Sequence, residues 1–283
     1  MLMRMSVASV VVGLMSLAAT ADEIQWKETQ NIPKGLNFPE DVTGDILGIE
    51  IGDSYAEAKA KLEKLKAESP PDFGGKPDAT IAESTEVIFL PLPGKGRIEA
   101  EMVGNIRLER AWLGKGQLRI TENLTVWLSA PSSGHQVHGL ERWLHYREQA
   151  DQVSIPEMLA KLEQKFGATP VMKFQGSESV QYLWRFDDRK LQNGLNKELK
   201  RSCGFASGFT VQQNEVENLN PTGDCDAALE VQFTYGISEN HAKGVRFQLF
   251  DIERIKSNLT ADFAFFDTYV EELRTQASPA PKL

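Results

Sequence analysis

His135-x-x-His138 has a metal-like spacing, and Glu141 and His145 follow it closely. Imidazole and carboxylate groups are the usual ligands of catalytic zinc, so metal-assisted hydrolysis is the chemistry to consider. In a strand, however, residues three apart point to opposite faces. The two histidines could converge only if the turn at 133–134 bends the backbone. Surface histidines beside a hairpin turn are the alternative, and the sequence favours it.

Other catalytic patterns are weak. Ser132 and Ser133 lie close to His135, but no nucleophile elbow or strand-turn-helix context accompanies them. The Gly-Lys-Gly triplets at 94–96 and 114–116 indicate hairpin turns, and no phosphate-binding or dinucleotide fingerprint is present. The sequence therefore favours a protein without enzymatic activity, and we expect no cofactor and no bound metal.

Aromatic and charged side chains give a clearer candidate. Two tryptophans fall on strand faces that are otherwise polar, and an exposed Trp beside Arg is typical of an interface hot spot. We predict a binding site made of Trp127, Trp143, Arg119, Glu141, His145 and Arg185. The alternative is that a loop or the opposite unit covers the two rings. In that case they belong to the core.

Alternating patterns predict the strands that position these residues. The pattern at 118–129 places Leu, Ile and Val on one face and Arg119, Asn123 and Trp127 on the other. We expect further strands at 85–90, 97–103, 106–113, 136–148, 180–186, 227–235 and 243–251. The polar stretch 187–226 is expected to be the least regular part of the chain.

Two helices are predicted from their start signals. Ser54 precedes Glu57 by three residues, and Ser154 precedes Glu157 in the same way, which is the capping-box pattern. Apolar residues then recur at helical spacing, and Gly167 provides a stop for the second helix. Each helix is apolar on one side only, so each requires a sheet to pack on. A third amphipathic helix is predicted near the C-terminus, with Leu259, Phe263, Phe266, Val270 and Leu273 on its apolar side.

The two capped helices suggest an internal repeat. Ser, Glu, Ala, Lys, Leu and Glu recur in the same register 100 positions apart, and antiparallel strands follow each helix. We predict an α+β fold of two tandem units, 45–150 and 151–276, with the helices on one face of the sheet. An N-terminal extension (22–44) precedes the units, and a disordered tail (277–283) follows them. The alternative is that short helices of this composition resemble one another by chance.

The stretch 48–57 and the helix end Lys165-Phe-Gly-Ala-Thr-Pro170 resemble BamE/SmpA-like lipoproteins and the tandem β-lactamase inhibitory protein fold. The resemblance implies helices on one face of an antiparallel sheet, with the other face free for a partner. This chain departs from the pattern because it lacks a lipobox, has one cysteine pair instead of one per repeat, and carries long insertions. No specific partner can therefore be transferred from the resemblance.

The N-terminus predicts the compartment. Residues 1–21 have an early Arg4, an apolar run and small residues at Ala19 and Ala21, which is the pattern of a secretory signal peptide. Cleavage near Ala21 would deliver the protein to the periplasm or outside the cell. Losing Arg4 moves the formal net charge from -9 to -10. Such an acidic protein is repelled by nucleic acid and anionic lipid.

The two cysteines, Cys203 and Cys225, are expected to form a disulfide in an oxidising compartment. Closing that loop contributes about 3 kcal/mol by restricting the unfolded chain. The sequence as a whole predicts a soluble periplasmic binding protein without a transmembrane anchor, whose partner is an envelope protein or peptide. A metal-dependent hydrolase that uses His135 and His138 is the alternative.

Overall fold

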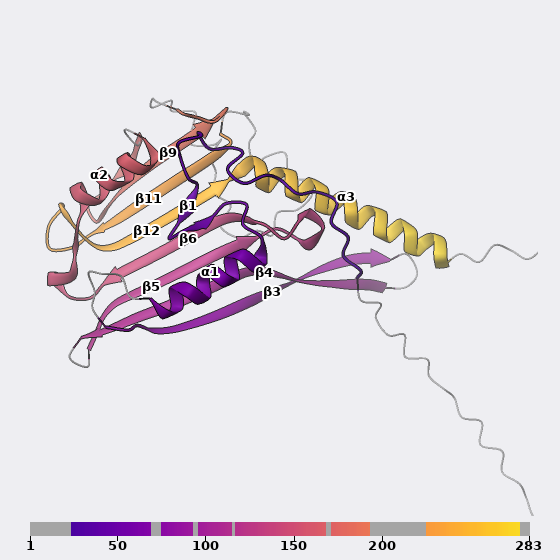
Figure 1. The fold of residues 1–283 in the computed structure, drawn as a ribbon, viewed down its shortest axis with the longest axis horizontal. Coiled ribbons are helices and arrows are strands. Elements are labelled where there is room, and N and C mark those ends of the chain that lie inside the picture. The colour runs from indigo at the N-terminus through magenta and orange to yellow at the C-terminus, as the bar shows by residue number, and fades with distance from the viewer. Residues whose placement is uncertain are drawn as a thin grey trace, which may run out of the picture.

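The computed structural model describes residues 24–68, 75–92, 96–114, 117–167, 171–192 and 225–277. The predicted signal peptide, Cys203 and all but the first residue of the predicted tail lie outside these ranges. The described chain forms a mixed α+β structure with one large antiparallel sheet and three α-helices (Figure 1). The predicted fold class is therefore confirmed at this level.

The large sheet has ten strands. Its main path runs in the order β10-β9-β11-β12-β6-β5-β4-β3, while β7 pairs with β12 and β8 pairs with β9. The strands are β3 (Asp78–Leu92), β4 (Gly96–Gly114), β5 (Gln117–Leu128), β6 (Val137–Tyr146), β7 (Val153–Ser154), β8 (Val171–Gln175), β9 (Ser179–Asp187), β10 (Lys190–Leu191), β11 (Ala227–Tyr235) and β12 (His241–Asp251). A separate hairpin joins β1 (Asp45–Ile46) to β2 (Ile49–Glu50).

A helix precedes each half of this sheet. Helix α1 (Tyr55–Ala67) leads into the meander β3-β4-β5-β6, and α2 (Ile155–Phe166) leads into β8, β9, β11 and β12. The halves join where β6 pairs antiparallel with β12. This element order agrees with the predicted tandem arrangement, but the described chain forms one continuous sheet across residue 150. Two separate units are therefore not confirmed.

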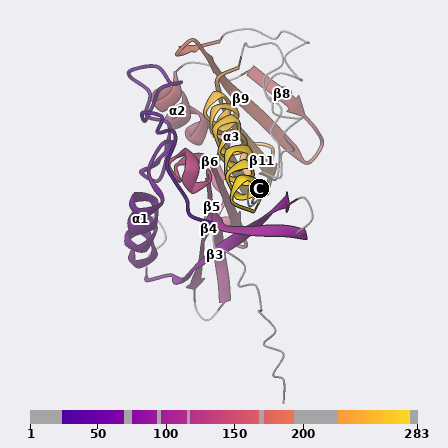
Figure 2. The same cartoon turned by 90° about the vertical axis from the view of Figure 1, so that its right-hand side faces the viewer.

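Both short helices pack on the same core. Side chains that alternate along the strands, among them Leu124 and Val126 of β5, Leu140 of β6 and Leu249 of β12, form a buried apolar cluster. The cluster includes Ala58 and Leu62 of α1 and Ile155 and Phe166 of α2. Figure 2 shows both helices on the same side of the sheet. We call this side the helix face and the other side the open face.

Helix α3 (Ile252–Ala277) has different neighbours. Its first turns contact Ala228 and Phe250, which alternate along their strands with Leu229 and Leu249 of the helix face. Successive strand residues point to opposite faces, so α3 begins on the opposite side of the sheet from α1 and α2. Its later turns pack against Ile98 and Ala100 of β4. Packing of all helices on one face is therefore not confirmed.

Strands β3 and β4 form a long hairpin with a bulge. The register shifts at Ser84, which pairs with Asn105, while Thr85 pairs with Val103 and leaves Gly104 unpaired. A one-residue bulge exchanges the two faces of a strand. Ile106 and Leu108 consequently join the helix-face core, whereas Ile98 and Ala100 contact α3. The two strands predicted at 97–103 and 106–113 are one strand because the bulge at Gly104 bends it without ending it.

The predicted helix starts are confirmed. At α1, the Ser54 hydroxyl accepts from the Glu57 amide (3.3 Å), and the Glu57 carboxylate accepts from the Ser54 amide (2.8 Å). This bond and Lys34 lower the pKa of Glu57 to about 2. At α2, Ser154 accepts from the Glu157 amide at 3.4 Å, and Gly167 ends the helix with φ of 91°. Residues 24–44 contain no helix, and only a short turn and β1–β2 precede α1.

Candidate functional site

All six predicted binding residues lie on the open face. Each one alternates with helix-face residues: Trp143, for example, stands between Arg142, which packs on Phe247, and the core residue Leu144. Arg185 likewise stands between the core residues Trp184 and Phe186. The strand pattern therefore assigned the faces correctly, although the six residues differ greatly in exposure.

Trp143 is the exposed aromatic residue at the centre of this face, with 52% of its surface accessible. It stands in register with residues of the neighbouring strands on both sides, in a line that crosses seven strands. The line consists of Thr80, Glu109, Asn123, Trp143, Arg246, Gln232 and Gln181, and we call it the Trp143 row. Six of the seven side chains are polar.

A hollow lies beside Trp143 on the β3–β5 side. It has a volume of about 440 Å³ and is lined by Asp78, Thr80, Glu109, Arg110, Ala111, Thr121 and Asn123. Most of these side chains carry a hydroxyl, amide or carboxylate oxygen. Trp143 does not line the hollow, but Asn123, which does, pairs directly with it across β5 and β6. The hollow and Trp143 thus lie on the same face of the sheet, one strand apart.

Two arginines on the open face, Arg246 and Arg119, are paired with carboxylates of the same chain. Arg246 donates to the two oxygens of Glu141 at 3.1 and 3.3 Å, and the Gln248 amide also donates to Glu141 at 3.1 Å. Arg119 donates to Asp151 from Nε at 2.8 Å, and its Nη2 forms a second bond. The guanidinium groups of Arg246 and Arg119 are therefore already compensated within the chain. Partial burial and the nearby Arg147 and Lys243 lower the pKa of His145.

Trp127 and Arg185 do not belong to the exposed part of this face. Trp127 packs against the cluster of Cys225, Ala228, Phe250, Ile252 and Ile255, where α3 begins. Arg185 pairs with Ala228 in the same region and is partly buried. The alternative considered for the tryptophans, coverage by another part of the chain, therefore applies to Trp127. It does not apply to Trp143.

The two histidines of the candidate metal site have different surroundings. The His135 ring stacks on Tyr55 with 4.8 Å between ring centroids, and its Nε2 lies 2.9 Å from the Val103 carbonyl oxygen. His138 is buried near Arg254, and burial lowers its pKa to about 3. Within the residues that the structure describes, no group of three or more His, Cys, Asp or Glu side chains could hold a metal ion.

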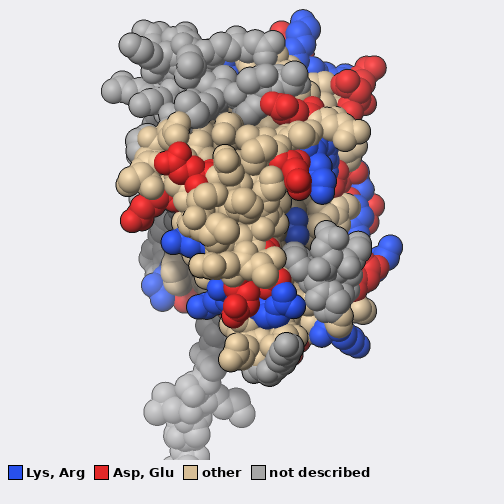
Figure 3. Space-filling view, turned by 90° about the vertical axis from the view of Figure 1, so that its left-hand side faces the viewer, with Lys and Arg blue, Asp and Glu red and all other residues tan. Residues whose placement is uncertain are grey.

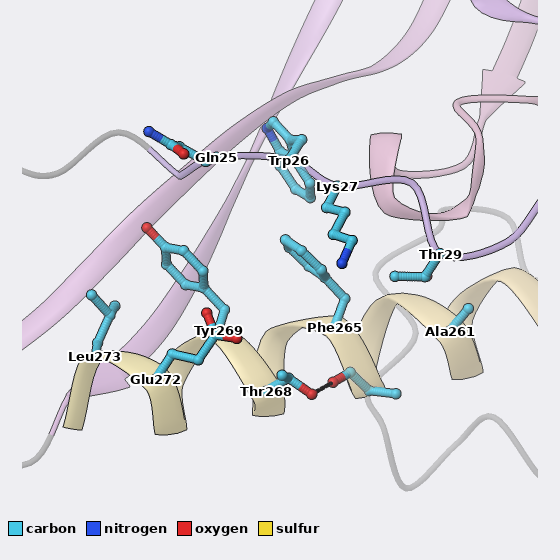
Figure 4. A pocket seen from close by; sticks show the side chains of 11 residues that line it. Gln25, Trp26, Lys27, Thr29, Ala261, Phe265, Thr268, Tyr269, Glu272 and Leu273 are labelled. Atoms are coloured by element: carbon cyan, nitrogen blue, oxygen red, sulfur yellow. Dashed lines mark hydrogen bonds between the residues drawn. The ribbon is translucent and has the colours of Figure 1, made fainter. Parts of the chain in front are cut away.

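Sequence reasoning missed a groove between α3 and the N-terminal segment. Figure 4 shows Trp26, Phe265 and Tyr269 in a column, with stacked rings whose centroids lie 5.7 and 6.1 Å apart. The groove has a volume of about 1040 Å³, and Gln25, Lys27 and Glu272 also line it. Residues 22–44 were treated as an N-terminal extension outside the two predicted units, so Trp26 was not considered. A lone Trp in a polar extension, opposite a predicted amphipathic helix, was the available signal.

The end of the sheet near α2 carries two exposed apolar side chains. Leu113, near the end of β4, is 64% exposed, and Ile237, in the turn between β11 and β12, is 54% exposed. Figure 3 views the molecule from this end and shows Lys, Arg, Asp and Glu around a largely uncharged middle. Neither apolar residue is part of the Trp143 row, so both can serve as controls for it.

Cys225 is buried against the start of α3. Its predicted partner Cys203 lies outside the described residues, so the disulfide stays a prediction. No helix in the described ranges has the length and apolar character needed to cross a bilayer. Comparison of the chain with models of known families, with curated proteins and with solved structures finds no match.

Proposed function

We propose that this chain is a periplasmic, non-catalytic binding protein that holds its partner on the open face, with Trp143 as the central anchor. The observation that carries the proposal is the 52% exposure of Trp143 in the middle of a polar row. A large aromatic side chain gains free energy when it leaves water, and Trp is enriched among the residues that dominate binding energy.

The proposed tandem arrangement supports this position for the site. Antiparallel strands follow each helix, and the last strand of each group, β6 or β12, pairs with the other. Trp143 on β6 and Arg246 on β12 are direct neighbours across this junction. The Trp143 row therefore runs without interruption across the junction of the two proposed units. The periplasmic location follows from the predicted signal peptide.

The experiment compares three proteins as baits in a periplasmic extract: the wild type, Trp143→Ala and Leu113→Ala. We expect a partner that the wild type and Leu113→Ala retain and that Trp143→Ala loses, with binding weakened by about 2 kcal/mol or roughly 30-fold. Leu113→Ala is the matched control because it also removes an exposed apolar side chain. Equal retention by all three proteins would contradict the proposal.

The thermal midpoint provides the accompanying control. An exposed side chain contributes little to folding, so Trp143→Ala should change the free energy of unfolding by at most about 0.5 kcal/mol. Trp127→Ala should cost about 3 kcal/mol, because its ring packs in the cluster at the start of α3. Comparing the two variants, Trp143→Ala and Trp127→Ala, therefore distinguishes a loss of binding from a loss of folding stability.

A further inference from the structure

We infer that the open face binds a neutral, hydroxyl-rich glycan, with a sugar ring stacked on Trp143 and its hydroxyls bonded to neighbours in the Trp143 row. The inference rests on the proposed function and specifies its ligand class. The sequence alone favoured an envelope protein or peptide as partner, with Arg119 and Arg185 supplying charge. The contacts made by these residues in the structure favour a different chemistry.

The first argument is the distribution of charge. Asp151 binds Arg119, and Glu141 binds Arg246, so both guanidinium groups are already compensated within the chain. Arg185 lies in the part of the face near the start of α3 and is partly buried. An acidic partner would have to compete with these internal pairs and desolvate them. A neutral ligand leaves them intact and can still accept hydrogen bonds from the same groups.

The second argument is the composition of the row. Six polar side chains accompany one exposed ring, whereas the centre of a typical protein interface is apolar and well packed. The row offers hydroxyl, carboxylate, amide and guanidinium groups at Thr80, Glu109, Asn123, Arg246, Gln232 and Gln181. A pyranose ring has one C–H-rich face, which packs on an indole, and a rim of hydroxyls that both donate and accept. These are the groups that the row can satisfy.

The third argument is spacing. Neighbouring strands lie about 4.8 Å apart, which is close to the length of one pyranose ring in an extended β-1,4-linked chain. A chain laid across the strands along the Trp143 row would therefore present about one sugar to each strand. The ring on Trp143 would be flanked by Asn123 on β5 and Arg246 on β12. Beyond Asn123, the next sugar would meet the polar hollow.

The test uses the full chain and three neutral hexasaccharides: the β-1,4-linked oligomers of N-acetylglucosamine and of glucose, and the α-1,4-linked oligomer of glucose as a contrast in shape. Binding is measured by calorimetry and by tryptophan fluorescence at low and high salt. We expect a β-1,4-linked oligomer to bind with the same affinity at both salt concentrations, because no ion pair forms with it.

Variants locate the binding. Trp143→Ala should weaken glycan binding by about tenfold or more, and Asn123→Ala and Gln232→Ala should each weaken it several-fold. Leu113→Ala should bind like the wild type. Trp26→Ala, in the groove beside α3, should also bind like the wild type. Binding that survives Trp143→Ala and fails in Trp26→Ala would place the glycan in that groove and overturn the inference.

The outcomes also separate the ligand class from the proposed function. If no hexasaccharide binds, while the wild type retains a polypeptide that Trp143→Ala loses, the glycan inference is wrong and the proposed function stands. If Trp143→Ala changes neither glycan binding nor polypeptide binding, both proposals are wrong.

Discussion

The two halves of the sheet hold their helices by different means. Beneath α1, Arg110 donates to the Leu65 and Glu68 carbonyl oxygens at the C-terminal end of the helix, at 2.9 and 3.1 Å. Beneath α2, the indole N–H of Trp184 donates to the Gly167 carbonyl oxygen at 3.2 Å. In both cases a helix-face side chain donates to carbonyl oxygens at the C-terminal end of the helix, where the regular intrahelical hydrogen bonds run out. The donor to the helix end is a buried cation in the first half and a neutral indole ring in the second half.

The difference matches the helix sequences. The buried residues of α1 are Ala58 and Leu62. Nearby, the buried Glu122 accepts from Arg110 Nε at 2.5 Å and from Arg142 Nε at 2.6 Å. Helix α2 instead buries Ile155 and Phe166, and Phe166 packs against Trp184 at 6.4 Å between ring centroids. The sheet near α1 thus carries a buried ion cluster, whereas the sheet beneath α2 packs aromatic rings.

Removing the central acid of the first half should have the largest effect. Glu122→Gln leaves the Arg110 guanidinium buried without its counter-ion, and breaking a buried pair in this way costs about 3 to 5 kcal/mol. Urea unfolding measures the loss. Replacing the exposed Glu109 by Gln, in the neighbouring strand, is the matched control and should change stability by less than about 0.5 kcal/mol. A small loss in Glu122→Gln would mean that charge does not hold α1.

The first half should also be sensitive to acid through His138. Its pKa is lowered to about 3 in the folded protein, whereas the ordinary value is about 6.5. The unfolded chain therefore binds a proton that the folded chain does not, and this contribution to stability is lost as the pH falls from above 6.5 towards 3. Between pH 7 and 5 the loss amounts to about 2 kcal/mol.

Unfolding of the His138→Gln variant at pH 7 and at pH 5 measures this contribution of His138 to stability. The variant should lose about 2 kcal/mol less than the wild type on acidification. Identical pH dependence of His138→Gln and the wild type would show that His138 is not buried in the neutral form.

Trp184→Phe tests the neutral anchor of the second half. The substitution keeps an aromatic ring and removes the N–H that Gly167 accepts from, so we expect a loss of about 1 to 2 kcal/mol, from the hydrogen bond and the smaller ring. Thermal unfolding measures it. The control is Trp143→Phe. Because Trp143 lies exposed on the open face, this substitution should not alter the midpoint of thermal unfolding.

Substitution of the two N-cap serines should give the smallest difference in stability between the halves. Ser54→Ala removes a hydroxyl from a complete box and should cost about 1 kcal/mol. At α2 only the Ser154 hydroxyl bond to the Glu157 amide is made, at 3.4 Å, so Ser154→Ala should cost about half as much. Chemical denaturation of the two variants in parallel measures the ratio. A greater loss in Ser154→Ala would reverse this order.

Local patterns were sufficient for the starts of α1 and α2 and for the faces of β5, β6 and β9. They were insufficient where a distant element decides the surroundings. Glu122 interrupts the apolar alternation of β5, and nothing nearby in the sequence shows that Arg110 and Arg142 neutralise it. Trp127 and Trp143 have similar strand patterns, yet only Trp127 meets the start of α3, more than 100 residues later. The exposed centre of the candidate site was therefore predicted, but its extent was not.

Arg254 sets a condition on the order in which this chain can fold. Its guanidinium donates to the Ile32 carbonyl oxygen at 2.9 Å, across 222 positions of sequence, and also binds Pro33. Contacts between such distant segments require a large loop to close, and folding slows as their share increases. In the described residues 24–44 there is no strand or helix before β1 to hold this segment in place. During synthesis, residues 32–33 can therefore make these contacts only after the much later residue Arg254 has emerged.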